Sequence, residues 1–147
     1  MERETYMASD TSDFGRSMGI ATSGLRAQAG RIKVISENIA NADSTAATSG
    51  ADPYRRKIPT FSSALDRTLD AKVVALGRVA PDQSAFRLKY EPANPAADQT
   101  GYVKYPNVNP LVEITDMRDA QRSYEANLNV VGATRRMIQR TLDILKT

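Results

Sequence analysis

The sequence predicts a mainly α protein in which two long terminal helices flank a small β-rich insert and pair with each other as a coiled coil. Apolar residues recur at alternating steps of three and four near both ends of the 147-residue chain, as one face of a long helix requires. Between these runs, prolines, glycines and short alternating stretches indicate strands and loops. We therefore expect a flexible extension at 1–13, a helix at 14–42, a β/loop insert at 43–110 and a second helix at 111–147.

The first predicted helix has an apolar seam that only Gln28 interrupts. The seam consists of Phe14, Met18, Ala21, Leu25, Gln28, Ile32, Ile35 and Ile39. Four glycines lie in the same run, and each costs a helix interior roughly 1 kcal/mol relative to alanine. So many glycines indicate that the helix packs closely against a neighbour, or that it becomes ordered only on assembly. They are Gly15, Gly19, Gly24 and Gly30.

The second predicted helix begins after Asn109-Pro110, because asparagine accepts bonds from unpaired N–H groups and proline fits the first turn. Its seam is Ile114, Met117, Gln121, Tyr124, Leu128, Val131, Arg135, Ile138, Leu142 and Leu145. Periodicity alone fits both a coiled coil and an ordinary amphipathic pair in a bundle. We expect Gln28 and Arg135 to reach solvent at the interface edge; the alternative is that they set the register. The predicted assembly seam comprises Leu25, Ile32, Ile35, Ile39, Met117, Tyr124, Leu128, Val131, Ile138 and Leu142.

The insert is expected to contain a few short strands between surface loops. Residues 86–90 alternate apolar and basic side chains, as a half-exposed strand does, and residues 72–79 are its expected partner. Residues 101–105 form another short extended run, and residues 42–53 and 91–100 read as loops.

The composition argues against an enzyme, a metal site and a bound cofactor. Histidine and cysteine are absent, which removes the commonest general base, thiol nucleophiles and the usual zinc ligands. The net charge of +3 is too thinly spread for nucleic-acid binding, and Arg55-Arg56-Lys57 is interpreted as solvated charge. No run approaches the roughly 20 apolar residues of a membrane span. The acidic first residues do not resemble a secretory signal.

Several motifs resemble those of a known family. Ser23-Gly-Leu25, followed by Ile35-Ser-Glu-Asn-Ile-Ala-Asn-Ala42, is similar to the N-terminal motif of bacterial flagellar rod and hook axial proteins. Residues 52–57, 90–109 and 117–127 resemble the proximal-rod protein C branch of this family. The residues that carry the resemblance are Asn38, Ile39, Ala40, Asn41, Pro53, Tyr54, Arg55, Arg56, Gly101, Tyr102 and Val103.

The resemblance implies a structural subunit that polymerises through its terminal helices into the torque-transmitting shaft of the flagellum, with the insert facing outward. The implied partners are other copies, other rod proteins, the surrounding basal-body rings and the flagellar type III export apparatus. The implied location is the basal-body rod crossing the periplasm, reached without a cleaved signal peptide from a start at Met1 or Met7. The alternatives are a cytoplasmic coiled-coil adaptor and a basic nucleic-acid-binding protein.

Overall fold

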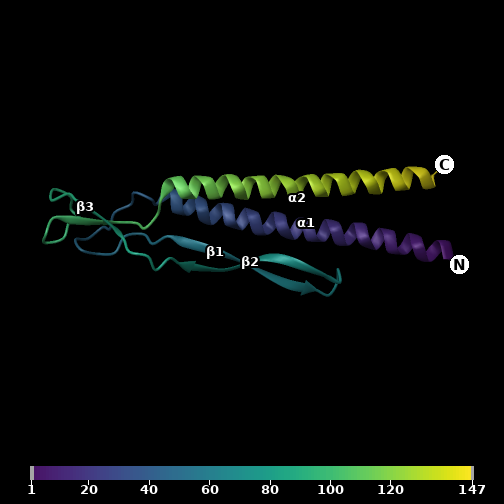
Figure 1. Cartoon of the computed structure of the whole chain (residues 1–147), viewed down its shortest axis with the longest axis horizontal. Coiled ribbons are helices and arrows are strands. Elements are labelled where there is room, and N and C mark those ends of the chain that lie inside the picture. The colour runs from purple at the N-terminus through teal and green to yellow at the C-terminus, as the bar shows by residue number, and fades with distance from the viewer. Residues whose placement is uncertain (1, 147) are drawn as a thin grey trace. The chain divides into compact units, whose positions relative to one another are not determined.

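The computed structural model describes residues 2–146, and it describes side chains from residue 13 onward. The elements are α1 (Glu2–Ala40), β1 (Lys57–Asp66), β2 (Ala71–Pro81), β3 (Arg87–Tyr90), β4 (Tyr102–Tyr105) and α2 (Pro110–Leu145), as Figure 1 shows. Terminal helices therefore flank a β region, as predicted. The chain divides into two compact units. The first comprises Met1–Gly30, Phe61–Gly77 and Ala120–Thr147, and the second Arg31–Thr60 and Arg78–Asp119.

The predicted start of the second helix is confirmed. Asn109 precedes α2, and its side-chain oxygen accepts a hydrogen bond from the Leu111 N–H at 3.1 Å. The Asn109 carbonyl accepts the N–H of Glu113 at 3.1 Å, which closes the first helical turn. By contrast, α1 begins at Glu2 rather than near residue 14, so residues 2–13 have a helical backbone.

The predicted strand pairing was wrong. β2 pairs with β1 and not with β3, and β3 pairs with β4 in a separate two-stranded sheet. The turn between β1 and β2 is set by Asp66, whose carboxylate accepts the N–H groups of Thr68 at 2.8 Å and Leu69 at 3.2 Å. Asp70 completes the reversal with a left-handed φ of 46°.

The β3–β4 pair closes around residues 91–100, which form the predicted loop. The strands are antiparallel, with Leu88 opposite Lys104 and Tyr90 opposite Tyr102. The Asp98 carboxylate accepts the Tyr102 N–H at 3.0 Å. Gly101 has a φ of 83°, which side chains rarely adopt, and an added Cβ would lie 2.8 Å from the Tyr90 ring. A glycine is therefore required where the loop enters β4.

In the first unit, small residues bring the elements close together. Ala21, Ala27 and Ala120 are buried. The close packing predicted from the α1 glycines is confirmed at three positions, where an added Cβ would collide with a neighbouring side chain. These pairs are Gly19 with Leu69, Gly24 with Asn127 of α2, and Gly30 with Leu76 of β2.

Candidate assembly surface

The second unit is organised around a fully buried asparagine at the end of α1. Asn38 is 0% exposed. Its amide nitrogen donates to the Lys57 carbonyl at 2.8 Å and to the Glu113 carboxylate at 3.0 Å. Its oxygen accepts the Lys57 N–H at 2.9 Å and the Tyr54 hydroxyl at 2.8 Å. The Asn38 side chain thus joins α1, the start of β1 and the start of α2, with all of its hydrogen-bonding capacity used.

Arg56 forms the second part of this cluster, and we call Asn38, Tyr54, Arg56 and Glu113 the polar junction. The Arg56 Nε donates to Glu113 at 2.6 Å, and Glu113 is only 1% exposed. The backbone N–H of Arg56 donates to the side-chain oxygen of Asn107 at 2.8 Å. Burial alone would lower the pKa of Arg56, but the hydrogen bond and charge of Glu113 raise it above its ordinary value. The buried carboxylate is therefore paired with a cation and hydrogen-bonded on both oxygens.

The neighbouring cations are also engaged, so the interpretation of Arg55-Arg56-Lys57 as solvated charge was wrong. Arg55 donates to the carbonyls of Asp82 at 3.0 Å and Ser84 at 3.1 Å. Its guanidinium lies 4.1 Å from the centre of the Phe86 ring. Lys57 forms an ion pair with Glu37 at 3.0 Å, and this partner raises the pKa of Lys57. The charged side chains of Arg55 and Lys57 therefore form contacts within the second unit.

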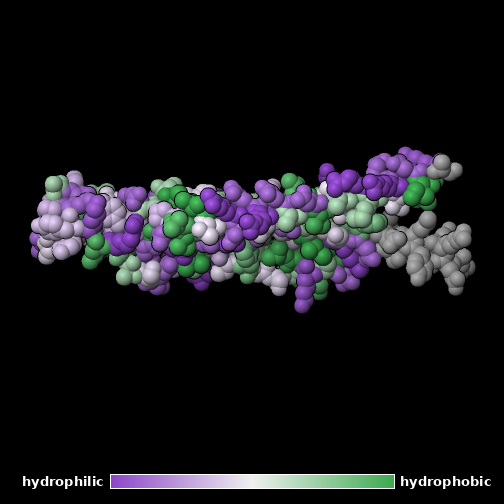
Figure 2. Space-filling view, turned by 45° about the horizontal axis from the view of Figure 1, so that its top comes forward, coloured by the Kyte–Doolittle hydropathy of each residue, from purple (hydrophilic) through white to green (hydrophobic). Residues whose placement is uncertain are grey.

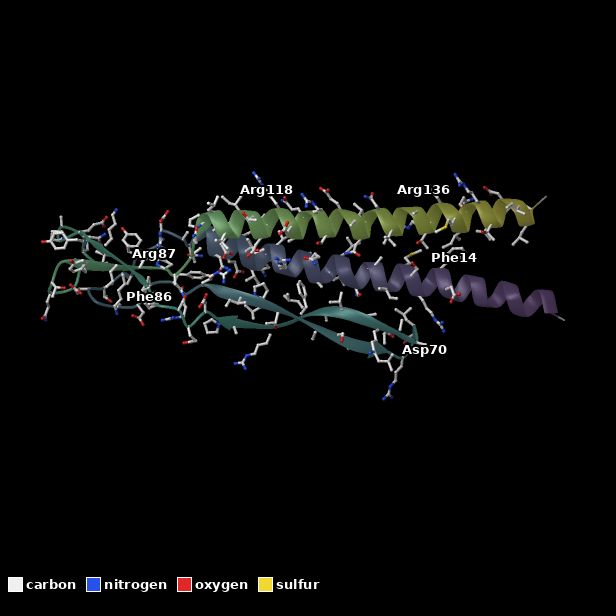
Figure 3. All side chains as sticks on the ribbon, in the orientation of Figure 1. Phe14, Asp70, Phe86, Arg87, Arg118 and Arg136 are labelled. Atoms are coloured by element: carbon white, nitrogen blue, oxygen red, sulfur yellow. The ribbon has the colours of Figure 1, made fainter. Side chains whose placement is uncertain are left out.

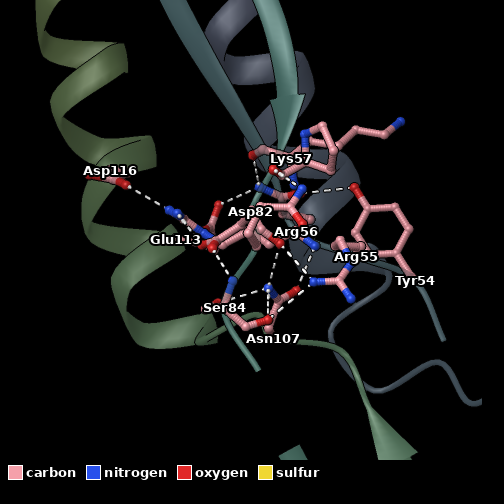
Figure 4. Close-up of polar contacts among 12 residues, drawn as sticks. Tyr54, Arg55, Arg56, Lys57, Asp82, Ser84, Asn107, Glu113 and Asp116 are labelled. Carbon is pink, nitrogen blue, oxygen red and sulfur yellow. Dashed lines mark hydrogen bonds and ion pairs between the residues drawn. The ribbon is translucent and has the colours of Figure 1, made fainter. Parts of the chain in front are cut away.

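The family motif residues fall into two places within the second unit. Asn38, Tyr54 and Arg56 belong to the polar junction, and Arg55 lies beside it (Figure 4). Asn41 follows the last turn of α1, where its amide donates to the Glu37 carbonyl at 2.8 Å; Ile39 and Pro53 are half-buried and Ala40 is exposed. Tyr102 and Val103 belong to β4, next to Gly101, and Val103 is 0% exposed.

Sequence reasoning missed the partners of these motif residues. Glu113 looks like a solvated charge at a helix start, and Asp82 and Asn107 stand in loops. Asn107 donates to the Asp82 carbonyl at 3.1 Å and to the Ser84 hydroxyl at 2.8 Å. The sequence did predict that α2 begins after Asn109-Pro110, which places Glu113 in the first helical turn. It did not predict which residues Glu113 contacts.

The predicted seam of α2 is divided between two faces of the helix. Met117, Tyr124, Val131 and Ile138 are half-buried. The other half of the inward face of α2 is formed by Glu113, Ala120, Asn127 and Thr134. Each of these residues directly precedes a predicted seam residue, namely Ile114, Gln121, Leu128 and Arg135. Leu128 is 52% exposed and Leu142 is 47% exposed, as are Ile114 at 42% and Leu145 at 56%. Leu128 and Leu142 therefore do not belong to the buried face of α2 in the single chain.

On α1 the seam residues lie mostly where they were expected. Ile35 is 2% exposed, and Leu25, Ile32 and Ile39 are half-buried. Arg135 of α2 reaches solvent as predicted. The same expectation was wrong for Gln28, because its side-chain oxygen is buried and has no hydrogen-bond partner among the described residues.

We call Leu128, Leu142 and Leu145 of the first unit the α2 stripe. Leu128 and Leu142 are two heptads apart and therefore share one side of the helix. Figure 2 shows green apolar surface interspersed among purple polar surface, and Figure 3 shows Arg136 pointing from α2 away from α1. Within residues 2–146, no helix is long and apolar enough to cross a membrane. Among the side chains described from residue 13 onward, no group of acidic residues could hold a metal ion.

Comparison with known proteins gives the family. Residues 18–47 match the model of the flagella basal body rod protein, and residues 99–144 match the C-terminal model of the flagellar basal body rod FlgEFG proteins. The flagellar basal-body rod protein FlgC of Agrobacterium fabrum is 52% identical over 127 residues, which cover 86% of this chain and 91% of the relative. The chain belongs to the FlgC family. The FlgC of Bacillus subtilis is 37% identical over 145 residues, covering 88% of this chain and 97% of the relative.

Membership of the FlgC family makes the chain a structural rod subunit of the bacterial flagellar basal body. The resemblance inferred from its motifs is thereby confirmed. The FlgC of Aquifex aeolicus is 35% identical over 134 residues, covering 91% of this chain and 98% of the relative. Neither a cytoplasmic adaptor nor a nucleic-acid-binding protein is favoured by these matches.

Proposed function

We propose that the chain polymerises through its terminal helices, which pair as a coiled coil within the subunit and pack against neighbouring subunits through the α2 stripe. The rod core then consists of residues 14–42 and 111–147, and the insert at 43–110 faces outward. In this proposal, the packed helices transmit torque from one subunit to the next. The partners are other copies, other rod proteins and the surrounding rings.

The observation that carries the proposal is that α2 has apolar residues on two sides. One side, including Val131 and Ile138, is half-buried in the single chain, and the other exposes the α2 stripe. Burying one leucine contributes about 1.5–3 kcal/mol, so a row of them favours association with a second apolar surface. In a subunit that remained monomeric, this second apolar side would stay exposed to water.

Substitution of Leu128 tests this proposal directly. Because Leu128 is 52% exposed, Leu128→Asp should lower the unfolding free energy of the isolated chain by only about 1 kcal/mol. In the assembled rod the same carboxylate would be buried without a partner, at a cost of several kcal/mol. We therefore expect cells with Leu128→Asp to make the protein but to lose basal-body rods and swimming.

Two exposed positions supply the controls. Asn129→Asp adds the same charge to the adjacent residue, which lies on another side of α2, and Arg122→Ala removes an exposed charge. Both variants should build rods. Normal rods in cells with Leu128→Asp would contradict the assembly surface proposed here, whatever the controls do.

The same proposal includes export by the flagellar type III apparatus into the periplasmic part of the basal body, without signal cleavage. The match to flagellar basal-body rod proteins supports a location in the basal body. Intact-mass analysis of subunits from purified basal bodies should give a chain that starts at Met1 or Met7. A mass that shows cleavage between residues 8 and 29 would contradict this route.

A further inference from the structure

The first unit contains one polar atom that is buried without a partner. The side-chain oxygen Oε1 of Gln28 is shielded from solvent and accepts no hydrogen bond from the described residues. An amide oxygen buried in this way loses its hydrogen bonds to water without a replacement, so it destabilises the arrangement that buries it. Gln28 also interrupts the apolar seam of α1, which an apolar residue would continue. The glutamine therefore lowers the stability of the single chain.

Gln28 lies where α1 and α2 approach each other closely. An added Cβ at Gly24, one turn earlier in α1, would lie 2.8 Å from the side chain of Asn127 in α2. Within the first unit the two helices run in opposite directions (Figure 1). Counting one turn forward along α1 and one turn back along α2 therefore places Gln28 level with Ser123.

The α2 side chains at this level do not bond to α1. The amide nitrogen of Asn127 donates to the backbone carbonyl of Ser123 in its own helix at 3.0 Å. The Ser123 hydroxyl donates to no acceptor among the described residues. Between residues 13–30 of α1 and 120–139 of α2, no hydrogen bond or ion pair joins the described side chains of the two helices. A donor is therefore available near the unpaired oxygen, and no polar contact fixes the two helices to each other here.

Small residues leave these helix segments able to move. Ala21 is 4% exposed and Ala120 is 0% exposed, and Gly24 has no side chain. Small side chains form shallow ridges and grooves, so they oppose a slight shift or rotation of one packed helix on another less than large ones do. In the second unit, by contrast, α1 and α2 are joined by the hydrogen bond from Asn38 to Glu113 at 3.0 Å.

We propose that Gln28 is a conformational switch coupled to assembly. Its oxygen is unpaired in the isolated chain, and in the assembled subunit a slight movement of α2 brings the Ser123 hydroxyl to donate to it. This inference rests on the proposed polymerisation and identifies an internal rearrangement that accompanies it. Leu128 of the α2 stripe directly follows Asn127, so a neighbour that packs on the stripe contacts the same turn of α2 that faces Gln28. Burial of the stripe and formation of this bond then favour the same state.

Gln28→Met tests the switch, because methionine is apolar and has nearly the same length and shape as glutamine. Removal of the unpaired oxygen should stabilise the isolated chain and lower its unfolding equilibrium constant by about fivefold or more, measured by urea unfolding and circular dichroism. The variant gains no hydrogen bond on assembly. The concentration that it needs for assembly, measured by sedimentation of purified protein, should therefore rise by about tenfold.

Ser123→Ala tests the donor. The hydroxyl makes no bond in the isolated chain, so its removal should change the unfolding equilibrium constant no more than about threefold, as the helix propensities of serine and alanine differ. The concentration needed for assembly should nevertheless rise as it does for Gln28→Met. A chain with both substitutions should assemble no worse than either single variant, because both changes remove the same bond. Gln99→Met, the same chemical change in an exposed loop, is the control and should leave both measurements unchanged.

Each other result overturns the inference. If Gln28→Met leaves the isolated chain equally stable or less stable, the oxygen is already satisfied there, for instance by a trapped water molecule. If Gln28→Met stabilises the chain but assembles at the unsubstituted concentration, the oxygen stays unpaired in the assembly. Additive effects of the two substitutions on assembly would assign the bond to a donor other than Ser123.

The proposed function is tested separately by Leu128→Asp. Loss of assembly in that variant would support polymerisation through the α2 stripe whatever the Gln28 and Ser123 variants do. If the unsubstituted chain never sediments, both the polymerisation proposal and this inference fail.

Discussion

Replacing Asn38 by alanine should weaken the fold far more than an ordinary loss of one polar side chain. The substitution removes two donated and two accepted hydrogen bonds at 2.8–3.0 Å. A buried polar group left without a partner costs about 1–3 kcal/mol. Glu113, at 1% exposure, cannot recover its lost bond from water, whereas the half-buried Lys57 backbone can do so in part. We therefore expect Asn38→Ala to lower the unfolding free energy by about 3–5 kcal/mol.

The second asparagine of the motif supplies the control. Asn41 makes one side-chain hydrogen bond, to the Glu37 carbonyl at 2.8 Å, and it is half-buried. Asn41→Ala should cost about 1 kcal/mol. Urea unfolding of the monomeric protein, followed by circular dichroism, measures both values. Equal losses for the two variants would refute the role assigned to Asn38.

An isosteric change at the same position adds a pH test. Asn38→Asp puts a carboxylate oxygen where the amide nitrogen stands, 3.0 Å from the Glu113 carboxylate. Two carboxylates this close are expected to share one proton, so the folded variant binds more protons than the unfolded chain. Its stability should therefore rise as pH falls from 7 towards 5, by more than that of the unsubstituted protein. A pH dependence identical to that of the unsubstituted protein would show that the geometry relaxes.

Two further predictions concern α1 and the β3–β4 loop. Gly24→Ala should destabilise the chain by about 1–3 kcal/mol in thermal unfolding, because the added Cβ would lie 2.8 Å from the Asn127 amide. Gly15→Ala is the control: an added Cβ there would have nothing within 4 Å, so this change should stabilise the chain by up to about 1 kcal/mol. Equal effects of the two substitutions would argue against close packing at Gly24. The hydrogen bond from Lys89, with others from Asn94 and Tyr105, lowers the pKa of Glu91 from 4.5 to about 2. Since a depressed carboxyl pKa stabilises the fold above the unfolded value, the loop should lose stability as pH falls from 4.5 through about 2, and an NMR titration midpoint near 4.5 would contradict this.

The helices could be predicted from the sequence because their signals are local. Asn109-Pro110 fixes the start of α2 through bonds within one turn, and the glycines of α1 reveal close packing by their helix cost alone. The start of α1 could not be placed in this way, because residues 2–13 have no apolar period and yet continue the helix.

The strand pairing and the polar junction depend on contacts between residues that are far apart in the sequence, and no local pattern predicts such contacts. The partner of β2 is β1, because the Asp66 turn reverses the chain before Ala71, whereas alternation alone had favoured the segment after Pro81. Glu113 lies 75 positions from Asn38, and no spacing rule links them. The heptad pattern of α2 identified Leu128 correctly as an apolar position but could not tell which of two neighbouring faces the single chain buries.

The central claim, that the exposed stripe of α2 packs against neighbouring rod subunits, can be measured with one engineered thiol. The chain contains no cysteine, so Leu128→Cys introduces a unique reactive group on the stripe. Gln99→Cys, in the exposed β3–β4 loop, places the same group on the insert, which is proposed to face outward. Maleimide labelling should modify both thiols in the isolated chain. In purified basal bodies it should modify position 99 but leave position 128 protected, and equal labelling of position 128 in the two states would contradict the claim.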